Sequence, residues 1–257
     1  MLNVIPRPSM RIVIHHPYFL PWLGYFSKLE FADAFVVLNN VGFRRDHIKR
    51  VHLFNSHNDV SWFCVPVGNN WGVPCDQIRL PSDPKYIEKM IRFLYYAYKH
   101  AGEFEREFPV FESLFRSVFR TNDYLIHADL DLVRGIRSHL GLKEQPIYLS
   151  SEVSTEKRRT ERLLEICYNL GASELLIGSG HMEEVHDLDL LRLNGVTVLR
   201  HDFARYHPTY LQLHSRRAGR AFVPGLSVVD ALLNVGAQYV AEMVTDSLFN
   251  PIVEEYV

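Results

Sequence analysis

The stretch IHHPYFLPWLGYFSKLEFADAFVVLNN, residues 14–40, decides the fold. RIVIH at 11–15 and AFVVL at 34–38 are short apolar runs typical of buried strands, and helix-compatible sequence lies between them, from about Pro21 to Phe31. Pro21 suits the first turn of a helix, where its missing N–H costs no hydrogen bond. A strand, a helix and a strand in such close succession predict a βαβ unit with parallel strands and a right-handed crossover.

A second unit of the same kind lies in the C-terminal half. It comprises IYLSSEV at 147–153, helical sequence from about 155 to 170, and ELLIGSG at 174–180. VTVLRHDF at 196–203 adds one more strand. This alternation predicts an α/β fold with a mostly parallel sheet and flanking helices, of the nucleotidyltransferase or Rossmann-like kind.

The segment between the two units has a different pattern. Residues 41–81 read as a β excursion, with VSWFCVPV at 60–67 as its clearest strand. Residues 84–140 carry aromatic and aliphatic side chains at helical spacing and predict a helical insertion. Neither segment has the composition of a linker.

Helix boundaries can be placed in two further regions. Asn122 is a suitable cap for a helix that runs to about His139, and Gly141 can end that helix. LSVVDALLNVG at 226–236 reads as an amphipathic closing helix. We expect residues 1–257 to form one domain that includes both the excursion and the insertion.

The composition restricts the class of protein. The 257 residues are 47% hydrophobic, and their 28 basic and 30 acidic residues give a net charge of −2, so overall charge favours neither nucleic acid nor an anionic membrane as a partner. Cys64, Cys75 and Cys167 form no C-x-x-C pair, which argues against a disulfide framework and a zinc site. With no secretory core in MLNVIPRPSM and no apolar run of about 18 residues, we expect a cytoplasmic protein without a membrane span.

Polar and aromatic side chains gather where the predicted strands end. In open parallel sheets, ligands bind at the carboxyl ends of the strands, near helix N-termini that attract anions. The candidates that follow the first two strands are His15, His16, Tyr18, Trp22, Gly24, Tyr25, Asn39 and Asn40. Those that follow the later strands are Ser150, Ser151, Gly178, Ser179 and His181. We expect these groups to converge in a single cleft.

The histidine pair is the strongest indication of acid–base chemistry. Imidazole has a near-neutral pKa, which suits proton transfer at physiological pH. A hydrogen-bonded structural histidine in a proline-rich turn is the alternative, and it stays open. Because adjacent side chains diverge, we expect only one of His15 and His16 to carry the chemistry.

Two basic runs have different expected roles. The first contains Arg44, Arg45, His47, Lys49, Arg50 and His52. Its arginines can hold phosphate oxygens through paired hydrogen bonds, although a solvated charged edge is the competing interpretation. The second run contains Lys157, Arg158, Arg159 and Arg162 along a predicted helix, and there we expect a solvated face.

Other familiar chemistries find little support. His181 and His186 lie near acidic residues, but no H-E-x-x-H frame exists and we expect no metal site. Ser179 lacks the nucleophile-elbow pattern of a serine hydrolase. Residues 11–38 loosely resemble the ATP-binding unit of class I nucleotidyltransferases and pantothenate synthetases, but Gly24-Tyr25 stands where Gly-His is expected. Neither G-x-G-x-x-G nor a P-loop is present, so the sequence names no cofactor.

The chain resembles the WbqC-like family. The resemblance begins with H-x-P-x-x-L-P-W-L-G-Y-F-x-K-L at 15–29 and A-D-x-F-V-x-L at 32–38. It continues through WFCVPV, the S-S-E turn at 150–152, LLIGSG and LSVVDALLNVG, and so covers nearly the whole chain.

This resemblance implies a general role. Members of the family occur among enzymes of O-antigen and other surface-polysaccharide assembly, and a role in transferring glycine or a related amino acid onto a sugar has been suggested. The family positions present in this sequence are His15, Pro17, Leu20, Pro21, Trp22, Gly24, Tyr25, Lys28, Asp33, Ser151, Gly178, Ser227, Asp230 and Asn234.

Three departures from the family pattern point to a different substrate. His16 stands where the family usually has Gln, and Asn39-Asn40-Val41-Gly42-Phe43 stands where it tends to have Asp-Asp-Val-Gln-Phe. The Trp-Gln-Asn-Arg-Asn pattern that follows in the family is replaced here by residues 45–50. If the family carboxylates bind a cation or act as a base, this chain does not do so in the same way.

These observations favour an acyl- or aminoacyltransferase that forms an amide on an amino sugar or a related amine, in surface-polysaccharide or natural-product biosynthesis. His15 would be the general base, Lys28 with Arg44 or Arg45 would hold donor phosphates, and Ser179 would complete the catalytic set. The expected partners are an activated acyl donor and an amine acceptor such as a nucleotide-linked sugar, with aminoacyl-tRNA as a further candidate donor. Two alternatives stay open: an ATP-using ligase or nucleotidyltransferase, and a non-catalytic protein that binds a nucleotide-linked sugar.

Overall fold

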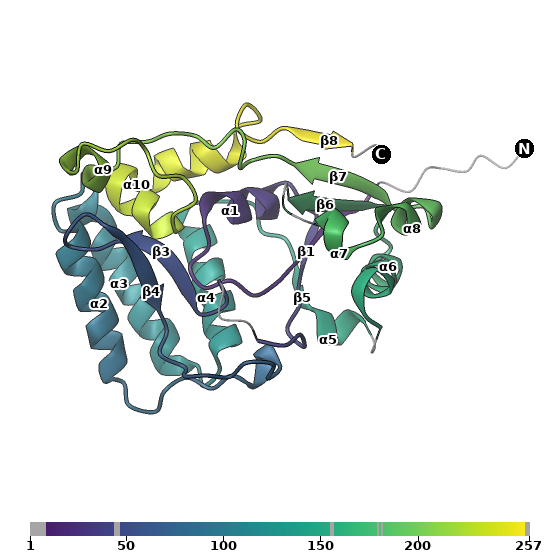
Figure 1. The fold of residues 1–257 in the computed structure, drawn as a ribbon, viewed down its shortest axis with the longest axis horizontal. Helices are drawn as coiled ribbons and strands as arrows, with labels where there is room; N and C mark the ends of the chain where they lie inside the picture. The colour runs from purple at the N-terminus through teal and green to yellow at the C-terminus, as the bar shows by residue number, and fades with distance from the viewer. Residues whose placement is uncertain (1–8, 44–46, 155–156, 179, 181, 255–257) are drawn as a thin grey trace, which may run out of the picture.

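A six-stranded sheet forms the centre of one half of the molecule (Figure 1). The computed structural model describes residues 9–43, 47–154, 157–178, 180 and 182–254. The strands are β1 (Arg11–His15), β2 (Ala34–Val37), β5 (Ile147–Leu149), β6 (Glu174–Gly178), β7 (Thr197–His201) and β8 (Ile252–Glu254), in the spatial order β5-β2-β1-β6-β7-β8. All neighbours are parallel except β7 and β8. The predicted mostly parallel α/β fold is confirmed.

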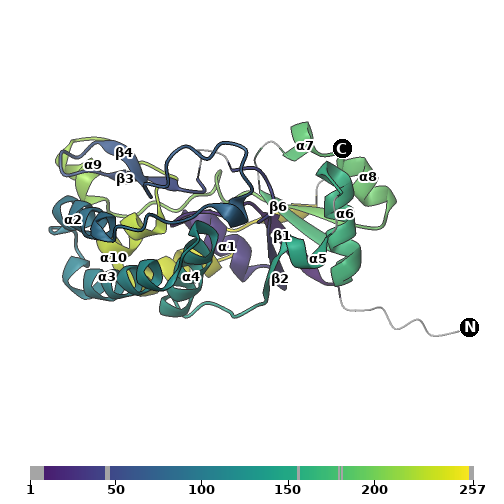
Figure 2. The same ribbon diagram turned by 90° about the horizontal axis from the view of Figure 1, so that it is seen from below.

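Helices cover both faces of this sheet because side chains alternate along each strand. Val13 and Phe35 pack into one core with α1 (Leu23–Glu30) and α10 (Val228–Thr245). Ile12 and Ala34 pack into a second core with α6 (Arg159–Leu170) and α8 (Leu188–Leu193). Figure 2 shows the sheet between these two layers.

The other half of the molecule is helical. It contains α2 (Lys85–Tyr98), α3 (Phe104–Thr121) and α4 (Leu125–His139), whose apolar faces belong to the same core as α1. The antiparallel hairpin of β3 (Arg50–Phe54) and β4 (Val60–Cys64) lies against them, with the rings of Phe63 and Phe93 5.3 Å apart. A 3₁₀ turn, η1 (Cys75–Gln77), then leads toward α2. The β excursion and the helical stretch are therefore both present.

Some predicted boundaries are wrong. Asn122 ends α3 and does not cap α4: its Nδ2 donates to the carbonyl of Val118 (3.0 Å), so the side chain completes the preceding helix. The strand predicted at 147–153 stops at Leu149, because α5 (Ser150–Val153) begins where Glu152 accepts a hydrogen bond from the Leu149 amide (2.9 Å). The short elements α7 (Met182–Val185), α8, α9 (Leu213–Arg217) and β8 were not predicted.

Helix α10 is kinked at Gly236, which has φ 82° and ψ 165°. The kink frees the Ala237 amide, which donates to Oε1 of the buried Glu107 on α3 (3.1 Å). His139 on α4 lies 2.6 Å from the other carboxylate oxygen of Glu107. One carboxylate thus joins three helices.

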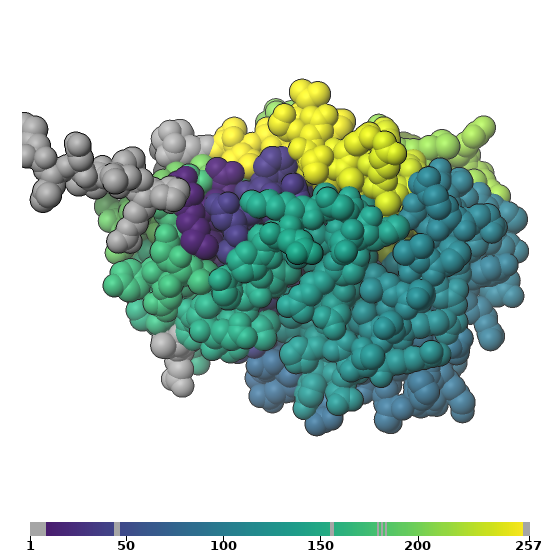
Figure 3. Space-filling model, turned by 180° about the vertical axis from the view of Figure 1, so that it is seen from behind, coloured from purple at the N-terminus to yellow at the C-terminus, as the bar shows by residue number. Residues whose placement is uncertain are grey.

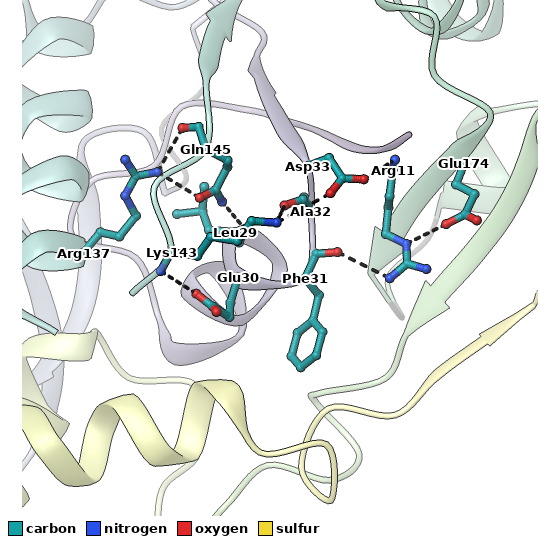
Figure 4. Close-up of polar contacts among 10 residues, drawn as sticks. All are labelled: Arg11, Leu29, Glu30, Phe31, Ala32, Asp33, Arg137, Lys143, Gln145 and Glu174. Atoms are coloured by element: carbon teal, nitrogen blue, oxygen red, sulfur yellow. Dashed lines mark hydrogen bonds and ion pairs between the residues drawn. The ribbon is translucent and has the colours of Figure 1, made fainter. Parts of the chain in front are cut away.

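The C-terminal end of α1 is held by side chains from other elements (Figure 4). Gln145 donates from Nε2 to the carbonyl of Leu29, and Arg11 donates to the carbonyl of Phe31 (3.4 Å). These bonds satisfy carbonyls that have no partner inside the helix. They also fix the position of α1 on the sheet, and therefore the position of Lys28 in its last turn.

The segment before α10 is held in place by hydrogen bonds to the buried carboxylate of Asp230. Asp230 accepts hydrogen bonds from the hydroxyls of Tyr98 (2.9 Å) and Tyr210 (2.7 Å) and from Gln212 Nε2 (3.2 Å). Seen from behind, the yellow C-terminal part lies directly above the purple start of the described chain and above the teal helices (Figure 3). The C-terminal segment therefore closes one side of the core that contains α1.

Candidate functional site

The strand order creates a topological switch point. From β1 the chain moves through β2 to β5 on one side, then returns to β6 and β7 on the other side of β1. Ligands of doubly wound sheets bind at such a point, outside the carboxyl ends of the two central strands. Here these ends carry His15, His16 and Gly178.

His15 is oriented as a proton acceptor. Its Nδ1 lies 2.9 Å from the carbonyl oxygen of His16, which can only accept, so Nδ1 carries the proton and Nε2 presents a lone pair. The ring contacts Tyr25 edge-on, with centroids 5.0 Å apart, and lies near Phe35. Burial, and then the nearby Lys28 ammonium, lower the pKa of His15 well below its usual value, so the imidazole is neutral at pH 7.

Lys28 reaches the same point from α1. Its side chain is only 7% exposed, and burial lowers its pKa from 10.5 to about 8. A methyl group added at Gly178 would lie 3.5 Å from Nζ, which places the amine at the end of β6. His15, Lys28 and Gly178 therefore meet at the switch point, although they are distant in sequence.

A buried polar group lies behind Lys28. Ser27 Oγ is 2.9 Å from Nε2 of His201 at the end of β7, and it also hydrogen-bonds to Oδ1 of Asn250 just before β8. Burial lowers the pKa of His201 to about 4, and Lys28 adds to this effect. A neutral imidazole beside Lys28 avoids repulsion between two cations.

His16 faces the opposite side of the sheet from His15. It lines a pocket of about 400 Å³ between the end of β1, the 41–43 and 71–72 loops, and the start of α6. Trp71, Arg159, Arg162 and His186 also line this pocket. We call it the basic pocket.

Asn39 and Asn40 form a clamp between β2, β5 and α6. Asn39 Oδ1 accepts hydrogen bonds from the Ser151 amide (3.0 Å) and the Ser150 hydroxyl (3.1 Å), and its Nδ2 donates to Ser151 Oγ (2.9 Å). Asn40 Oδ1 accepts from Ser150 Oγ (2.8 Å) and from Arg162 Nη1 (3.2 Å). Asn39, Asn40 and Ser151 therefore lie together as predicted, and Asn40 orients an arginine of the basic pocket.

The remaining predicted ligand-binding residues have different surroundings. Trp22 packs its ring over Gly24, where a side chain would overlap the indole, and stacks on His207 (centroids 6.0 Å apart). This explains Gly24 by close packing. Tyr18 and Tyr25 lie beside His15, with burial raising the pKa of both hydroxyls.

Four predicted site residues, Arg44, Arg45, Ser179 and His181, lie outside the described residues. Their roles stay predictions. Gly178, which precedes Ser179, is at the switch point.

The sequence reasoning missed several residues of this region. Arg159 and Arg162, expected on a solvated face, line the basic pocket, and His201 approaches Lys28 from the far strand β7. The signal for the arginines was their place at the start of a helix that follows a strand, where an anion site is common. Trp71 carried no comparable signal, since it sits in a turn-like segment.

Features elsewhere give weaker indications. A larger hollow of about 720 Å³ lies between α3 and α4 and is mostly apolar, but it is away from the strand ends where ligands of this fold class bind. In the part of the chain that the structure describes, no three His, Cys, Asp or Glu side chains gather to hold a metal ion. Within that same part, no helix has the length and apolar character needed to cross a membrane.

The fold and the switch point define an α/β protein with a basic and histidine-bearing crevice at the carboxyl edge of its sheet. The chain belongs to the WbqC-like protein family, whose model matches residues 16–242. It is also similar to the uncharacterized protein Rv1507c of Mycobacterium tuberculosis (strain ATCC 25618 / H37Rv), with 24% identity over 238 residues, covering 89% of this chain and 95% of the relative. No solved structure matches the chain.

Proposed function

We propose that this protein is an acyl- or aminoacyltransferase that forms an amide on an amino sugar or a related amine, in surface-polysaccharide or natural-product biosynthesis. The observation that carries the proposal is the pairing of a neutral His15, whose Nε2 presents a lone pair, with the buried Lys28 at the switch point. The family resemblance supports the same reaction class.

His15 fits the role of general base. The amine nitrogen attacks the carbonyl carbon of the donor, the new C–N bond forms, and Nε2 removes a proton from that nitrogen. When the bond between the carbonyl carbon and the leaving group breaks, the same proton passes to the leaving group. The lowered pKa of His15 keeps the ring unprotonated throughout the neutral range, so Nε2 is free of a proton when the amine arrives, and it makes the ring a weaker base than free imidazole.

Lys28 fits the stabilisation of negative charge on the donor. With a pKa of about 8, the amine is mostly protonated at pH 7, and its site is buried enough for a single charge to act strongly. A positive charge there favours the oxyanion that develops as the tetrahedral intermediate forms. The rate should therefore fall as pH rises above about 8, because Lys28 then loses its proton.

His15→Gln tests the base. Glutamine can still donate to the His16 carbonyl and fill much of the ring's space, so we expect little change in melting temperature but at least a hundredfold loss of amide formation, in line with general-base contributions of about 10²–10⁴. The assay combines glycyl thioesters or glycyl-tRNA with nucleotide-linked amino sugars and detects amides by mass spectrometry. The exposed His57→Gln is the matched control. Equal activity of both variants would remove His15 from the mechanism.

ATP distinguishes the ligase alternative. That alternative places phosphates at the start of α1, but Leu23 and Gly24 are buried there and the Trp22 ring covers Gly24. We therefore expect ATP neither to raise the melting temperature nor to release pyrophosphate or phosphate in the presence of amino acids. Tight binding of a nucleotide-linked sugar with no turnover would instead support a binding protein.

A further inference from the structure

We propose that the basic pocket binds the phosphate groups of a small-molecule substrate, with a planar ring of that substrate against Trp71. The chemical class is a nucleoside diphosphate or its sugar conjugate. This inference deepens the proposed function, and it rests on that function only for the reaction that the bound ligand undergoes. Binding of the ligand does not require turnover.

The charge of the pocket is the first argument. Arg159, Arg162, His16 and His186 all line it, and its described lining residues include no carboxylate. The two arginines are charged at neutral pH and give the pocket a positive local field, although the chain as a whole has a net charge of −2. An anionic ligand is the natural complement of such a field.

The geometry of Arg162 is the second argument. Its Nη1 donates to Asn40 Oδ1 (3.2 Å) and its Nε donates to the carbonyl of Lys157 (2.8 Å). Both partners are neutral, so they orient the guanidinium without cancelling its charge. An arginine held in this way loses little side-chain entropy when it binds a phosphate, and its planar fork suits two phosphate oxygens.

The start of α6 supplies further donors. The Arg158 side chain makes no capping hydrogen bond to the start of α6, and Arg159 has a left-handed backbone with φ 50°, a costly conformation for a residue with a side chain. The pocket therefore adjoins the N-terminus of α6, an end of a helix that attracts anions. Nδ1 of His186 is also buried and has no partner among the described residues, which leaves a polar atom of this lining side chain without a partner.

The rim of the pocket indicates the rest of the ligand. Trp71 is 67% exposed, and Leu38, Phe43 and Val185 provide apolar surface next to it. A base or a sugar ring can pack there, and pockets of this size hold small cofactor-sized ligands. His16 directly follows His15 in the chain, so the pocket opens at the same strand end as the proposed base, on the other side of the sheet.

The experiment measures binding, by titration calorimetry, of pyrophosphate, UDP and uridine to the full chain. We expect UDP and pyrophosphate to bind and uridine to bind at least tenfold more weakly than UDP. Arg159→Gln and Arg162→Gln should each weaken UDP and pyrophosphate about tenfold or more, and raised salt should weaken both ligands. Trp71→Ala should weaken UDP only.

Arg158→Gln is the matched control. It removes the same charge from the next residue, which does not line the pocket, and should change affinity less than about threefold. Failure of pyrophosphate to bind at millimolar concentration, or equal loss in Arg158→Gln and Arg162→Gln, would overturn the phosphate site. Melting curves show that each variant is folded. If the wild-type chain binds UDP and pyrophosphate but forms no amide with any donor and acceptor tested, the transferase is refuted and the pocket stands.

Discussion

Lys28 is a cation in the core of the protein, and its burial has an energetic cost. The pKa falls from 10.5 to about 8 on folding, a difference of about 2.5 units. Since the unfolded chain binds the proton more tightly, folding is penalised at every pH below about 8, and the penalty disappears as pH rises from 8 to 10.5. At about 1.4 kcal/mol per unit, the penalty approaches about 3 kcal/mol.

Replacing Lys28 by methionine should therefore stabilise the protein at pH 7, by up to about 3 kcal/mol, while it reduces activity. The advantage of the variant should shrink between pH 8 and 10, because the wild-type amine then becomes neutral. Urea denaturation at pH 7 and 9.5 measures both effects, with the exposed Lys89→Met as the control. A variant less stable than wild type at pH 7 would show that Lys28 has a favourable partner.

The sequence predicts that His15, Lys28 and Ser179 line one cleft, because all three belong to the carboxyl-end side of the sheet. Lys28 lies near His15 and Gly178 in the structure, whereas Ser179 lies outside the described residues, so the complete set stays a prediction. Arg159 is exposed, as expected for a solvated face, but its place beside the basic pocket was not predicted, because charged spacing along a helix does not reveal which end of the sheet the helix start faces. His201 lies on a strand that follows four other strands of the same sheet in the chain, and only the sheet order brings it beside Lys28.

At the scale of elements, helix α10 depends on one glycine. Gly236 has backbone angles that only glycine adopts readily, and a side chain there would overlap Arg106. Gly236→Ala should lower the free energy of unfolding by about 1–3 kcal/mol from backbone strain, with a further loss from the displaced Ala237–Glu107 hydrogen bond. The overlap adds little, because the end of the exposed Arg106 side chain can move aside.

Gly195→Ala is the comparison for this prediction. Gly195 also has a positive φ, of 79°, but no atom lies within 4 Å of an added methyl group. It should therefore report backbone strain alone, and Gly236→Ala should be clearly more destabilising in urea. Equal losses would mean that the Glu107 junction contributes nothing to stability.

Most elements could be predicted because their patterns are local. The apolar runs of β1 and β2 and the helical spacing of α2 and α3 depend on residues close in sequence. Predicted boundaries were wrong where one side chain could take either of two roles. Asn122 could cap α4, but in the structure it ends α3. Strand β8 has only three residues and pairs with β7, about fifty positions earlier in the chain, so no local sequence pattern predicts it.

At the scale of the molecule, the arrangement of the strands could not be predicted, although their presence could. A parallel βαβ unit predicts that β1 and β2 are neighbours. No local sequence pattern predicts that the two strands of the second unit pair with different partners, β5 with β2 and β6 with β1. That split creates the switch point. The site therefore depends on contacts between residues that are distant in sequence, which form when the two cores pack.

The opposite orientations of His15 and His16 have a consequence for the order of events in the proposed reaction. One histidine faces the layer of α1 and the other faces the layer of α6, so two reactants can approach the end of β1 from different sides of the sheet. Neither needs to depart before the other enters. Initial-velocity measurements with both substrates varied should give intersecting lines in double-reciprocal plots, the pattern of a ternary complex. Parallel lines would instead mean that the acyl group is first transferred to the protein as a covalent intermediate.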